Sequence, residues 1–285
     1  MILIADSGST KTDWALINSA EIIKNEQSIG LNPDFHKQNS IAREIQQVAI
    51  NLGQGDAIDR IYFYGSGASS KARQAPLISA LKESFPSSKI EVAHDLLGAA
   101  RASLKEQSGL VGILGTGSNC CAYNGEEVTK EYRSGGFILS DEGGGVFMGK
   151  MLLKAFIEDQ LDKDLKEALQ LEYGLSVDLI LKKIYKSDLP NRFIASFAVF
   201  MHRNATQPQI KSIIEANFNA FFEQKVCRFE HYQDLPLGLV GSVANHFEAQ
   251  LMQAAKRFKC RISVIEARPI QGLVAYHQTK LVSER

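Results

Sequence analysis

The chain has 285 residues, of which 45% are hydrophobic and 22% charged, and its 32 basic and 32 acidic side chains cancel. These proportions are typical of a soluble globular protein of about two domains. A balanced charge argues against a broad nucleic-acid-binding surface, which needs a basic excess. The apolar runs are much shorter than a membrane span and no signal peptide is visible, so we expect a cytoplasmic protein without membrane or nucleic-acid partners.

Short apolar runs and amphipathic segments alternate along the first half of the chain. They predict strands over residues 1–6, 12–17 and 21–28, a helix over 41–52, a strand over 61–64, a helix ending near Phe85, a strand over 90–93 and a helix over 96–104. Strands followed by such alternation indicate an α/β lobe with helices covering a sheet.

The same order of elements recurs in the second half, although the two halves share little sequence beyond a glycine-rich loop. It predicts strands over 110–115, 120–123 and 127–132, a helical stretch over about 146–232 broken at Gly174, Pro190 and Pro208, a strand over 237–240, a helix over 243–258 and a strand over 262–265, with Pro269 and Gly272 shaping the last turn. We place the boundary at polar residues 107–109. This divides the chain into an N-terminal lobe (1–107) and a C-terminal lobe (108–285) with a helical insertion.

Two loops rich in glycine and hydroxyl residues each follow an apolar strand. They lie at residues 6–12 and 115–119. Glycines allow backbone N–H groups to approach an anion, and serine and threonine hydroxyls add donors. An acid at the strand end, such as Asp6, suits Mg²⁺ beside a phosphate. Two such loops predict two jaws that grip a nucleoside triphosphate.

Four segments in order resemble the motifs of a known superfamily. Residues 6–12 and 115–119 resemble the two phosphate motifs of the actin, sugar-kinase and heat-shock chaperone superfamily, and residues 241–243 resemble its adenosine motif. Residues 135–144 resemble the Gly-Gly-Trp-Gly…Gly-Asp-Glu-Gly-Ser stretch of N-acetylglucosamine kinases, which share a family with the activator ATPases of benzoyl-CoA reductase and hydroxyglutaryl-CoA dehydratase. The resemblance implies two actin-like (ribonuclease H-like) lobes, each a mixed sheet with flanking helices, and ATP between them.

The resemblance also implies which residues bind the nucleotide. Asp6 would lie near Mg²⁺ and the transferring phosphate, acting through water; its alternative is a turn-forming acid. The other implied contacts are Gly8, Ser9, Thr10 and Lys11 of the first loop, Gly115, Thr116 and Gly117 of the second, and Gly241, Ser242 and Asn245 of the adenosine motif. A solvated charge is the alternative for Lys11, and a helix N-cap for Ser242.

Asp95 is the implied catalytic base, because phosphoryl transfer needs a group that orients the hydroxyl and accepts its proton. A helix N-cap is its alternative role. The implied sugar contacts are Asn32, Asp95, Asn119, Gly136, Phe137, Ile138 and Asp141, with Glu142 a weaker candidate. A plain turn beside Pro33 is the alternative for Asn32, and Asn119 is placed to reach either ligand.

The segment departs from the kinase pattern at two places. The Trp-Gly pair of the kinases is Phe137-Ile138 here, and Ser140 replaces the glycine before the acid pair. A side chain at Ile138 must either point away from the sugar or occupy space in its pocket. We expect the second, and therefore a weaker fit for N-acetylglucosamine.

The implied activity is ATP-dependent phosphorylation of an amino sugar, N-acetylglucosamine at its 6-hydroxyl above all. Two alternatives stay open: an activator ATPase of a radical dehydratase or reductase, and a nucleotide- or sugar-binding regulator without turnover. The activators hold an iron–sulfur cluster on cysteines at a dimer interface. The four cysteines here lack a Cys-x-x-Cys pair, and we expect them to be reduced and mostly buried. Phenylalanines of the helical stretch predict core packing or the face of a homodimer.

Overall fold

The computed structural model describes residues 1–53 and 57–283. The chain divides into two compact units. The first gathers Met1–Val111, Ala122–Lys130 and Glu266–Arg285, and the second gathers Gly112–Cys121 and Glu131–Ile265. The last helix of the chain therefore belongs with the N-terminal residues. The lobes 1–107 and 108–285 were predicted as two continuous segments of the sequence, and this division stays a prediction.

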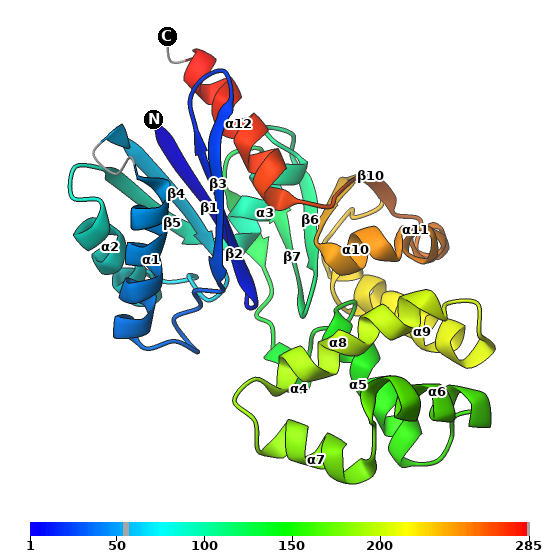
Figure 1. Ribbon diagram of the computed structural model, residues 1–285. Helices are drawn as coiled ribbons and strands as arrows, with labels where there is room; N and C mark the ends of the chain where they lie inside the picture. Colours follow the sequence, from blue (N-terminus) through cyan, green and yellow to red (C-terminus); the bar gives the residue numbers. More distant parts are fainter. Residues whose placement is uncertain (54–56, 284–285) are drawn as a thin grey trace. The chain divides into compact units, whose positions relative to one another are not determined.

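The first sheet has the strand order β3-β2-β1-β4-β5 (Figure 1). Its strands are β1 (Ile2–Ser7), β2 (Lys11–Ile17), β3 (Ile22–Ile29), β4 (Arg60–Gly65) and β5 (Lys89–His94). β1 pairs antiparallel with β2 and parallel with β4, while β2 and β3 are antiparallel and β4 and β5 are parallel. The sheet is therefore mixed, and the five strands predicted in this half are confirmed.

Helices cover both faces of the first sheet. They are α1 (Gln38–Leu52), α2 (Lys71–Ser84), α3 (Asp95–Ser103) and α12 (Pro269–Ser283). α1 and α2 pack on the face that carries Leu3 and Ala5, whereas α3 and α12 pack on the face that carries Ile2 and Ile4. Because successive strand residues point to opposite faces, the side chain of Asp6 lies on the same face as those of Ile2 and Ile4, the face covered by α3. On this face β1 therefore presents two apolar side chains and then one acid.

The second sheet repeats the order of the first. Its strands are β6 (Gly109–Leu114), β7 (Ser118–Tyr123), β8 (Val128–Glu131), β9 (Pro236–Val240) and β10 (Arg261–Glu266), arranged β10-β9-β6-β7-β8. In both sheets the first strand in sequence is central, the second and third lie on one side and the fourth and fifth on the other. The predicted structural repeat is confirmed at the level of strand order.

The second unit carries most of the helices. They are α4 (Gly136–Leu139), α5 (Gly145–Ile157), α6 (Lys163–Tyr173), α7 (Val177–Tyr185), α8 (Pro190–Arg203), α9 (Pro208–Gln224), the short 3₁₀ segment η2 (Val226–Arg228), α10 (Ser242–His246) and α11 (Glu248–Arg257). The predicted breaks are confirmed: Gly174 ends α6 in the left-handed conformation, with φ 60°, and Pro190 and Pro208 begin α8 and α9. A further break, between α5 and α6, includes Asp159 at φ 56° and had no glycine to signal it.

Two sequence-based expectations near the end of the chain are wrong. Pro269 and Gly272 do not shape a turn, because Pro269 begins helix α12 and Gly272 lies within it. A Cβ on Gly272 would lie 2.4 Å from the carbonyl oxygen of Ala102, so the glycine permits close packing of α12 on α3. The expected helix over 243–258 is interrupted at buried Phe247, whose φ of −109° separates α10 from α11.

Most phenylalanines of the helical insertion lie in the core. Five of its phenylalanines are at most 1% exposed: Phe197, Phe200, Phe218, Phe221 and Phe222. All four cysteines are free; Cys120 and Cys121 are buried, and Cys227 and Cys260 are half-buried. Among residues 1–53 and 57–283, no helix is long and apolar enough to cross a bilayer.

Candidate active site

The first glycine loop is a tight hairpin between β1 and β2. The Gly8 N–H donates to the Lys11 carbonyl at 3.0 Å. Beneath the turn, the buried hydroxyl oxygens of Ser7 and Thr12 lie 2.8 Å apart, and Thr12 Oγ1 donates to the Ile29 carbonyl at 2.9 Å. These two hydroxyls serve the fold, which leaves Gly8, Ser9 and Thr10 at the surface of the unit.

The segment after β3 supports this loop from behind. A Cβ on Gly30 would lie 2.3 Å from the Gly8 carbonyl oxygen, and the Gly30 N–H donates to the Thr10 carbonyl at 3.1 Å. Only glycine permits this approach of two backbones. The shape of the predicted phosphate loop therefore depends on a residue outside it.

Three carboxylates influence one another beside this loop. Asp6 and Asp13 are direct partners across the β1–β2 ladder, so their side chains lie on the same face of the sheet. Burial raises the pKa of Asp6 to about 7, with further upward contributions from Asp13 and Asp95 and a downward one from Lys11. Lys11 Nζ lies 2.8 Å from Asp13 Oδ2. Lys11 is therefore part of an ion pair rather than only a solvated charge.

Asp95 is the first residue of α3, and His94 occupies the N-cap position. Asp95 Oδ1 lies 3.1 Å from His94 Nε2, but the geometry gives no hydrogen bond, and among residues 1–53 and 57–283 this buried oxygen has no hydrogen-bond partner. Burial raises the pKa of Asp95, opposed by His94 and by the Leu96 N–H. A buried acceptor without a donor calls for a ligand or water as its partner.

Asn32 is buried and forms a turn, as the alternative interpretation expected. Its Oδ1 accepts from the Asp34 N–H at 2.8 Å, and its Nδ2 donates to Ser66 Oγ at 3.4 Å. A Cβ on Gly67 would lie 2.3 Å from Asn32 Oδ1, so a second glycine packs against this amide. The sugar contact of Asn32 stays a prediction.

In the second unit, the glycine loop after β6 rests on the first turn of α5. The Gly145 N–H donates to the Gly115 carbonyl at 2.8 Å, and the Val146 N–H donates to the Thr116 carbonyl at 2.9 Å. A Cβ on Gly241 would lie 2.4 Å from the Leu114 carbonyl oxygen. The adenosine-motif glycine, held at φ 113°, therefore packs directly against the strand that enters the phosphate loop.

Asp141 connects this loop to the kinase-like segment. It is buried, its φ is 70°, and its Oδ1 accepts from the Ser118 N–H and from Ser134 Oγ, both at 3.3 Å. Its Oδ2 would lie 2.6 Å from a Cβ on Gly117. The contacts described for Asp141 hold the second predicted phosphate loop in place, and its contact with a sugar stays a prediction.

Glu142 forms a buried ion pair with Lys225. Its Oε2 lies 3.2 Å from Lys225 Nζ, and both side chains are 8% exposed. Ser140 Oγ accepts from Lys225 Nζ at 2.6 Å and donates to Glu142 Oε2 at 3.2 Å. The serine that departs from the kinase pattern therefore joins the two charges, and the contacts described for the Glu142 carboxylate hold the turn rather than a ligand.

The short helix α4 carries the other departures from the kinase pattern. Lys150 Nζ donates to the carbonyl oxygens of Phe137 at 2.7 Å and Ile138 at 3.3 Å. The side chain of Phe137 is half-buried, whereas Ile138 is 69% and Leu139 82% exposed. Gly136 begins the helix at φ 68°. The Ile138 side chain is thus accessible from solvent, and its contact with a sugar stays a prediction.

Helix α10 presents the remaining predicted residues. Gly241 occupies its N-cap, so Ser242 is a helical residue and not the cap. Ser242, Asn245 and His246 are exposed, and the spacing of three and four residues places them on one face of α10. The His246 ring lies 5.3 Å from the ring of His202.

In the second loop, Asn119 Oδ1 accepts from the Cys120 N–H at 2.9 Å.

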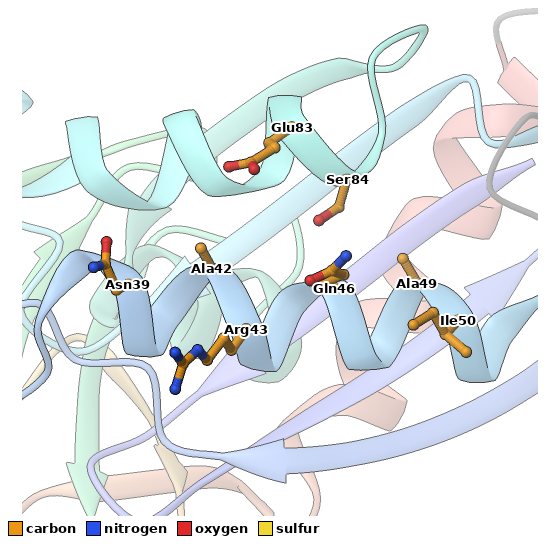
Figure 2. Close-up of a pocket in the computed structure, with 8 residues that line it drawn as sticks. All are labelled: Asn39, Ala42, Arg43, Gln46, Ala49, Ile50, Glu83 and Ser84. Atoms are coloured by element: carbon orange, nitrogen blue, oxygen red, sulfur yellow. The ribbon is translucent and has the colours of Figure 1, made fainter.

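A groove elsewhere in the first unit contains none of these residues. It runs between α1 and α2, as Figure 2 shows, with Glu83 and Ser84 facing α1. Its other lining residues are Asn39, Ala42, Arg43, Gln46, Ala49 and Ile50. The predicted site residues Asp6 and Asp95 lie instead at the ends of β1 and β5.

Residues 5–262 match the model of the BadF/BadG/BcrA/BcrD ATPase family. The chain belongs to this family. Among solved structures it is similar to a candidate N-acetylglucosamine kinase from Porphyromonas gingivalis, with 36% identity, 98% of this chain and 99% of that chain covered, and a TM-score of 0.94. No curated protein matches the chain.

Two more distant structures share the fold of this ATPase family member. A candidate N-acetylglucosamine kinase from Chromobacterium violaceum is 16% identical, with a TM-score of 0.73 over 96% of this chain and 98% of that one. A ROK family glucokinase from Streptomyces griseus, in complex with glucose and AMPPNP, is 13% identical, with a TM-score of 0.62 over 96% and 97%. The predicted fold of two sheets with flanking helices, of the actin-like and sugar-kinase type, is confirmed.

Three residues of the site of this ATPase family member were missed from the sequence. Asp13 lies seven positions after Asp6, and a hairpin centred on residues 9 and 10 places the two opposite each other. That signal was available once the hairpin was predicted. Lys225 and Asn217, whose Oδ1 accepts from the Gly143 N–H at 2.9 Å, come from α9 and the residue that follows it, and nothing local in the sequence indicates them.

Removing the Asp6 charge should stabilise the protein in a pH-dependent way. The ordinary pKa of the carboxyl is 3.8, and the folded value is about 7. Between these values the folded protein retains a proton that the unfolded chain has lost, so the contribution of Asp6 to stability falls as the pH rises. Asp6→Asn abolishes this effect. Its free energy of unfolding should exceed that of the wild type by an amount that grows by up to about 1 kcal/mol per pH unit over this window.

Urea unfolding at about pH 4.5 and about pH 8 measures this difference. Asp34→Asn is the matched control, because this acid of the same unit has a side chain that is 41% exposed. A difference between Asp6→Asn and wild type that stays constant with pH would contradict the prediction.

Lys225→Met should destabilise the protein by about 3–5 kcal/mol, because it leaves the Glu142 carboxylate buried without its cation. Lys225→Met/Glu142→Gln should recover most of that loss, since no unpaired charge remains. Lys163→Met is the control, because Lys163 pairs with Glu167 at the surface and is 85% exposed. Chemical denaturation of the wild type and these three variants measures the free energies of unfolding. Equal losses of stability in Lys225→Met and in the double variant would refute the buried pair.

Proposed function

We propose that the protein is a sugar kinase that transfers the γ-phosphoryl group of ATP to an amino sugar, with N-acetylglucosamine and its 6-hydroxyl as the first candidates. The observation that carries this proposal is the buried Asp95 Oδ1, which lacks a hydrogen-bond donor within the described part of the chain. Asp95 begins the helix that packs on the Asp6 side of the first sheet. Similarity to the Porphyromonas gingivalis protein supports the choice of sugar, and membership of an ATPase family supports ATP as the donor.

Asp95 acts as the general base in this proposal. A sugar hydroxyl donates a hydrogen bond to Oδ1, and its proton passes to that oxygen as the hydroxyl oxygen bonds to the γ-phosphorus of ATP. The bond between the γ-phosphorus and the β,γ-bridging oxygen breaks in the same step, and ADP leaves with that oxygen. Burial raises the pKa of Asp95, which makes the carboxylate a stronger proton acceptor, and its position in the first turn of α3 opposes that shift by favouring the carboxylate electrostatically.

The cluster of Asp6 and Asp13 fits Mg²⁺. Neighbouring carboxylates raise the pKa of Asp6, and a divalent cation would relieve that repulsion. Among the residues that the structure describes, no three His, Cys, Asp or Glu side chains converge as a ligand set. Asp6 would therefore hold a Mg²⁺ ion that keeps most of its ligands as water and phosphate oxygens, and that ion would neutralise charge on the phosphates.

The two glycine loops are proposed as phosphate-binding elements, each within its own unit. Gly8, Ser9, Thr10 and Lys11 supply the first, and the second consists of Gly115, Thr116 and Gly117. Gly241, Ser242 and Asn245 are proposed to contact adenosine. For the sugar, Asn32, Asn119, Asp141 and residues 136–138 stay the proposed contacts. We also propose that the two lobes comprise residues 1–107 and 108–285. We further propose that the protein is cytoplasmic and forms a homodimer.

A coupled assay of ADP release over a panel of hexoses and hexosamines tests the function. We expect ADP release to depend on an amino sugar, with N-acetylglucosamine preferred over glucose. ADP release that is equal with and without every sugar would favour the activator ATPase instead. Binding of ATP without turnover of any kind would favour a regulator.

Ile138→Gly should lower KM for N-acetylglucosamine or widen the range of accepted acyl groups, with little change in KM for ATP. The side chain is 69% exposed in its unit and adjoins the proposed sugar segment, and one altered contact is worth about 1–3 kcal/mol. Leu139→Gly is the matched control, because it loosens the same helix from the neighbouring, 82% exposed position. If both KM and acyl tolerance are unchanged, the side chain faces away from the substrate.

A further inference from the structure

Helix α3, which begins with Asp95, lies unusually close to strand β4. A Cβ on Gly98 would lie 2.7 Å from Tyr64 Cβ and 2.9 Å from Tyr64 Cγ. Gly98 comes three residues after Asp95, so the Tyr64 side chain lies beneath the first turn of the helix. Tyr64 is also the direct partner of Asp6 across the parallel β1–β4 ladder. One residue therefore lies next to Asp6 along the sheet and below Asp95 along the helix.

The far end of Tyr64 is held by the last turn of α3 and by α12. Arg101, in the last turn of α3, donates from Nη1 to the Tyr64 hydroxyl oxygen at 2.7 Å. His277 Nε2, from α12, lies 2.9 Å from the same oxygen. A guanidinium can only donate, so the Tyr64 oxygen accepts from Arg101. We assign the Tyr64 hydroxyl proton to His277 Nε2, because this arrangement gives both the hydroxyl proton and the ring nitrogen a partner. His277 is then the neutral tautomer with its proton on Nδ1, in line with burial lowering its pKa to about 3.

Helix α12 holds α3 at a second point as well. The Gly272 backbone packs on the Ala102 carbonyl so closely that a Cβ there would lie 2.4 Å from its oxygen. The Arg101 guanidinium lies 5.4 Å from the centre of the Tyr276 ring, and its Nη1 lies 3.2 Å from Glu91 Oε1. The last turn of α3 is therefore fixed from three sides, and a nine-residue helix moves as one body.

We propose that Tyr64 and His277 are positioning residues that hold α3 at the height and tilt which bring Asp95 to the reacting hydroxyl. The inference rests on the proposed function, in which Asp95 accepts the proton. The Tyr64–His277 hydrogen bond fixes the orientation of Tyr64 beneath α3, so its loss lets the Tyr64 ring shift under Gly98 and displaces the first turn, which carries Asp95. A shift of about 1 Å at a reacting group can cost up to about a hundredfold in rate.

Tyr64→Phe and His277→Leu test the proposal by separating kcat from KM. Tyr64→Phe retains the ring under Gly98 and removes only the hydroxyl. His277→Leu removes the acceptor together with a buried ring that packs on Tyr62, so Tyr64→Phe is the cleaner of the two variants. We expect each to lower kcat at saturating ATP and sugar by about tenfold or more, while both KM values change by less than about twofold. His277→Gln, whose side-chain oxygen still accepts, should recover most of the rate.

The double variant and a matched control complete the design. Because both changes break one hydrogen bond, Tyr64→Phe/His277→Leu should lose no more rate than the worse single variant. Tyr62→Phe is the control: it removes a hydroxyl from the same strand, and the Tyr62 ring lies 4.1 Å from that of His277. All rates are compared below the melting temperature of each variant, and Arg101→Lys replaces any variant that does not fold.

Variants that lose thermal stability but keep the wild-type kcat would overturn the inference, because the network would then be only structural. Equal losses in Tyr62→Phe and Tyr64→Phe would overturn it too. A wild-type protein without sugar-dependent ADP release would overturn the proposed function itself, and the role of Asp95 on which the inference depends.

Discussion

Asp95→Asn should fold normally and lose about a hundredfold or more in kcat. The amide retains the shape of the carboxyl but cannot accept the hydroxyl proton, and the unpartnered Oδ1 is where that proton would go. KM for ATP should change little, because in the proposal Asp95 contacts the sugar hydroxyl and not the phosphates. Burial already raises the pKa of Asp95, so removing the charge should not reduce the melting temperature.

The measurement is steady-state ADP release by wild type, Asp95→Asn and Asp34→Asn, with melting temperatures recorded in parallel. Asp34 is the control because this acid of the same unit pairs with Arg73, 3.2 Å away, and its side chain is 41% exposed. Activity of Asp95→Asn within a few-fold of the wild type would remove Asp95 as the base. Loss of activity together with loss of folding would be answered with Asp95→Glu, which retains the acid.

Gly8→Ala and Gly115→Ala should each weaken binding of Mg²⁺-ATP by tenfold or more, on the order of 1.4 kcal/mol or above. The protein itself has room for both methyl groups. A Cβ on Gly8 meets only the Lys11 carbonyl oxygen at 3.7 Å, and a Cβ on Gly115 meets no atom within 4 Å. Any loss of affinity would therefore result from a clash between the added methyl group and the phosphate, which must approach the backbone at this position.

Calorimetry of ATP binding to the two variants measures this effect, and unchanged melting temperatures show that the fold tolerates them. Gly117→Val is a useful contrast. It should abolish ATP binding, but a Cβ at this position would lie 2.6 Å from Asp141 Oδ2, so the variant also disturbs the protein. Unchanged affinity in both Gly8→Ala and Gly115→Ala would show that neither loop binds the phosphates.

Local patterns in the sequence determined most of the elements. Alternating and continuous apolar runs predicted the ten strands because side chains in a strand repeat every two residues. Gly174, Pro190 and Pro208 marked helix ends because they restrict or release the backbone at one residue. The glycine loops and the segment at 135–144 indicated the family, since each is a continuous stretch whose chemistry can be read without the fold.

Tertiary structure alone decided what surrounds those segments. The Glu142–Lys225 pair joins residues 83 positions apart, and the Tyr64–His277 hydrogen bond joins residues 213 apart. Whether Ser140 binds a ligand or a lysine depends on where α9 ends, and whether Pro269 begins a helix or a turn depends on the face that α3 offers to it. Such contacts arise from the packing of distant elements, and no local pattern of polar and apolar residues encodes which two elements will meet.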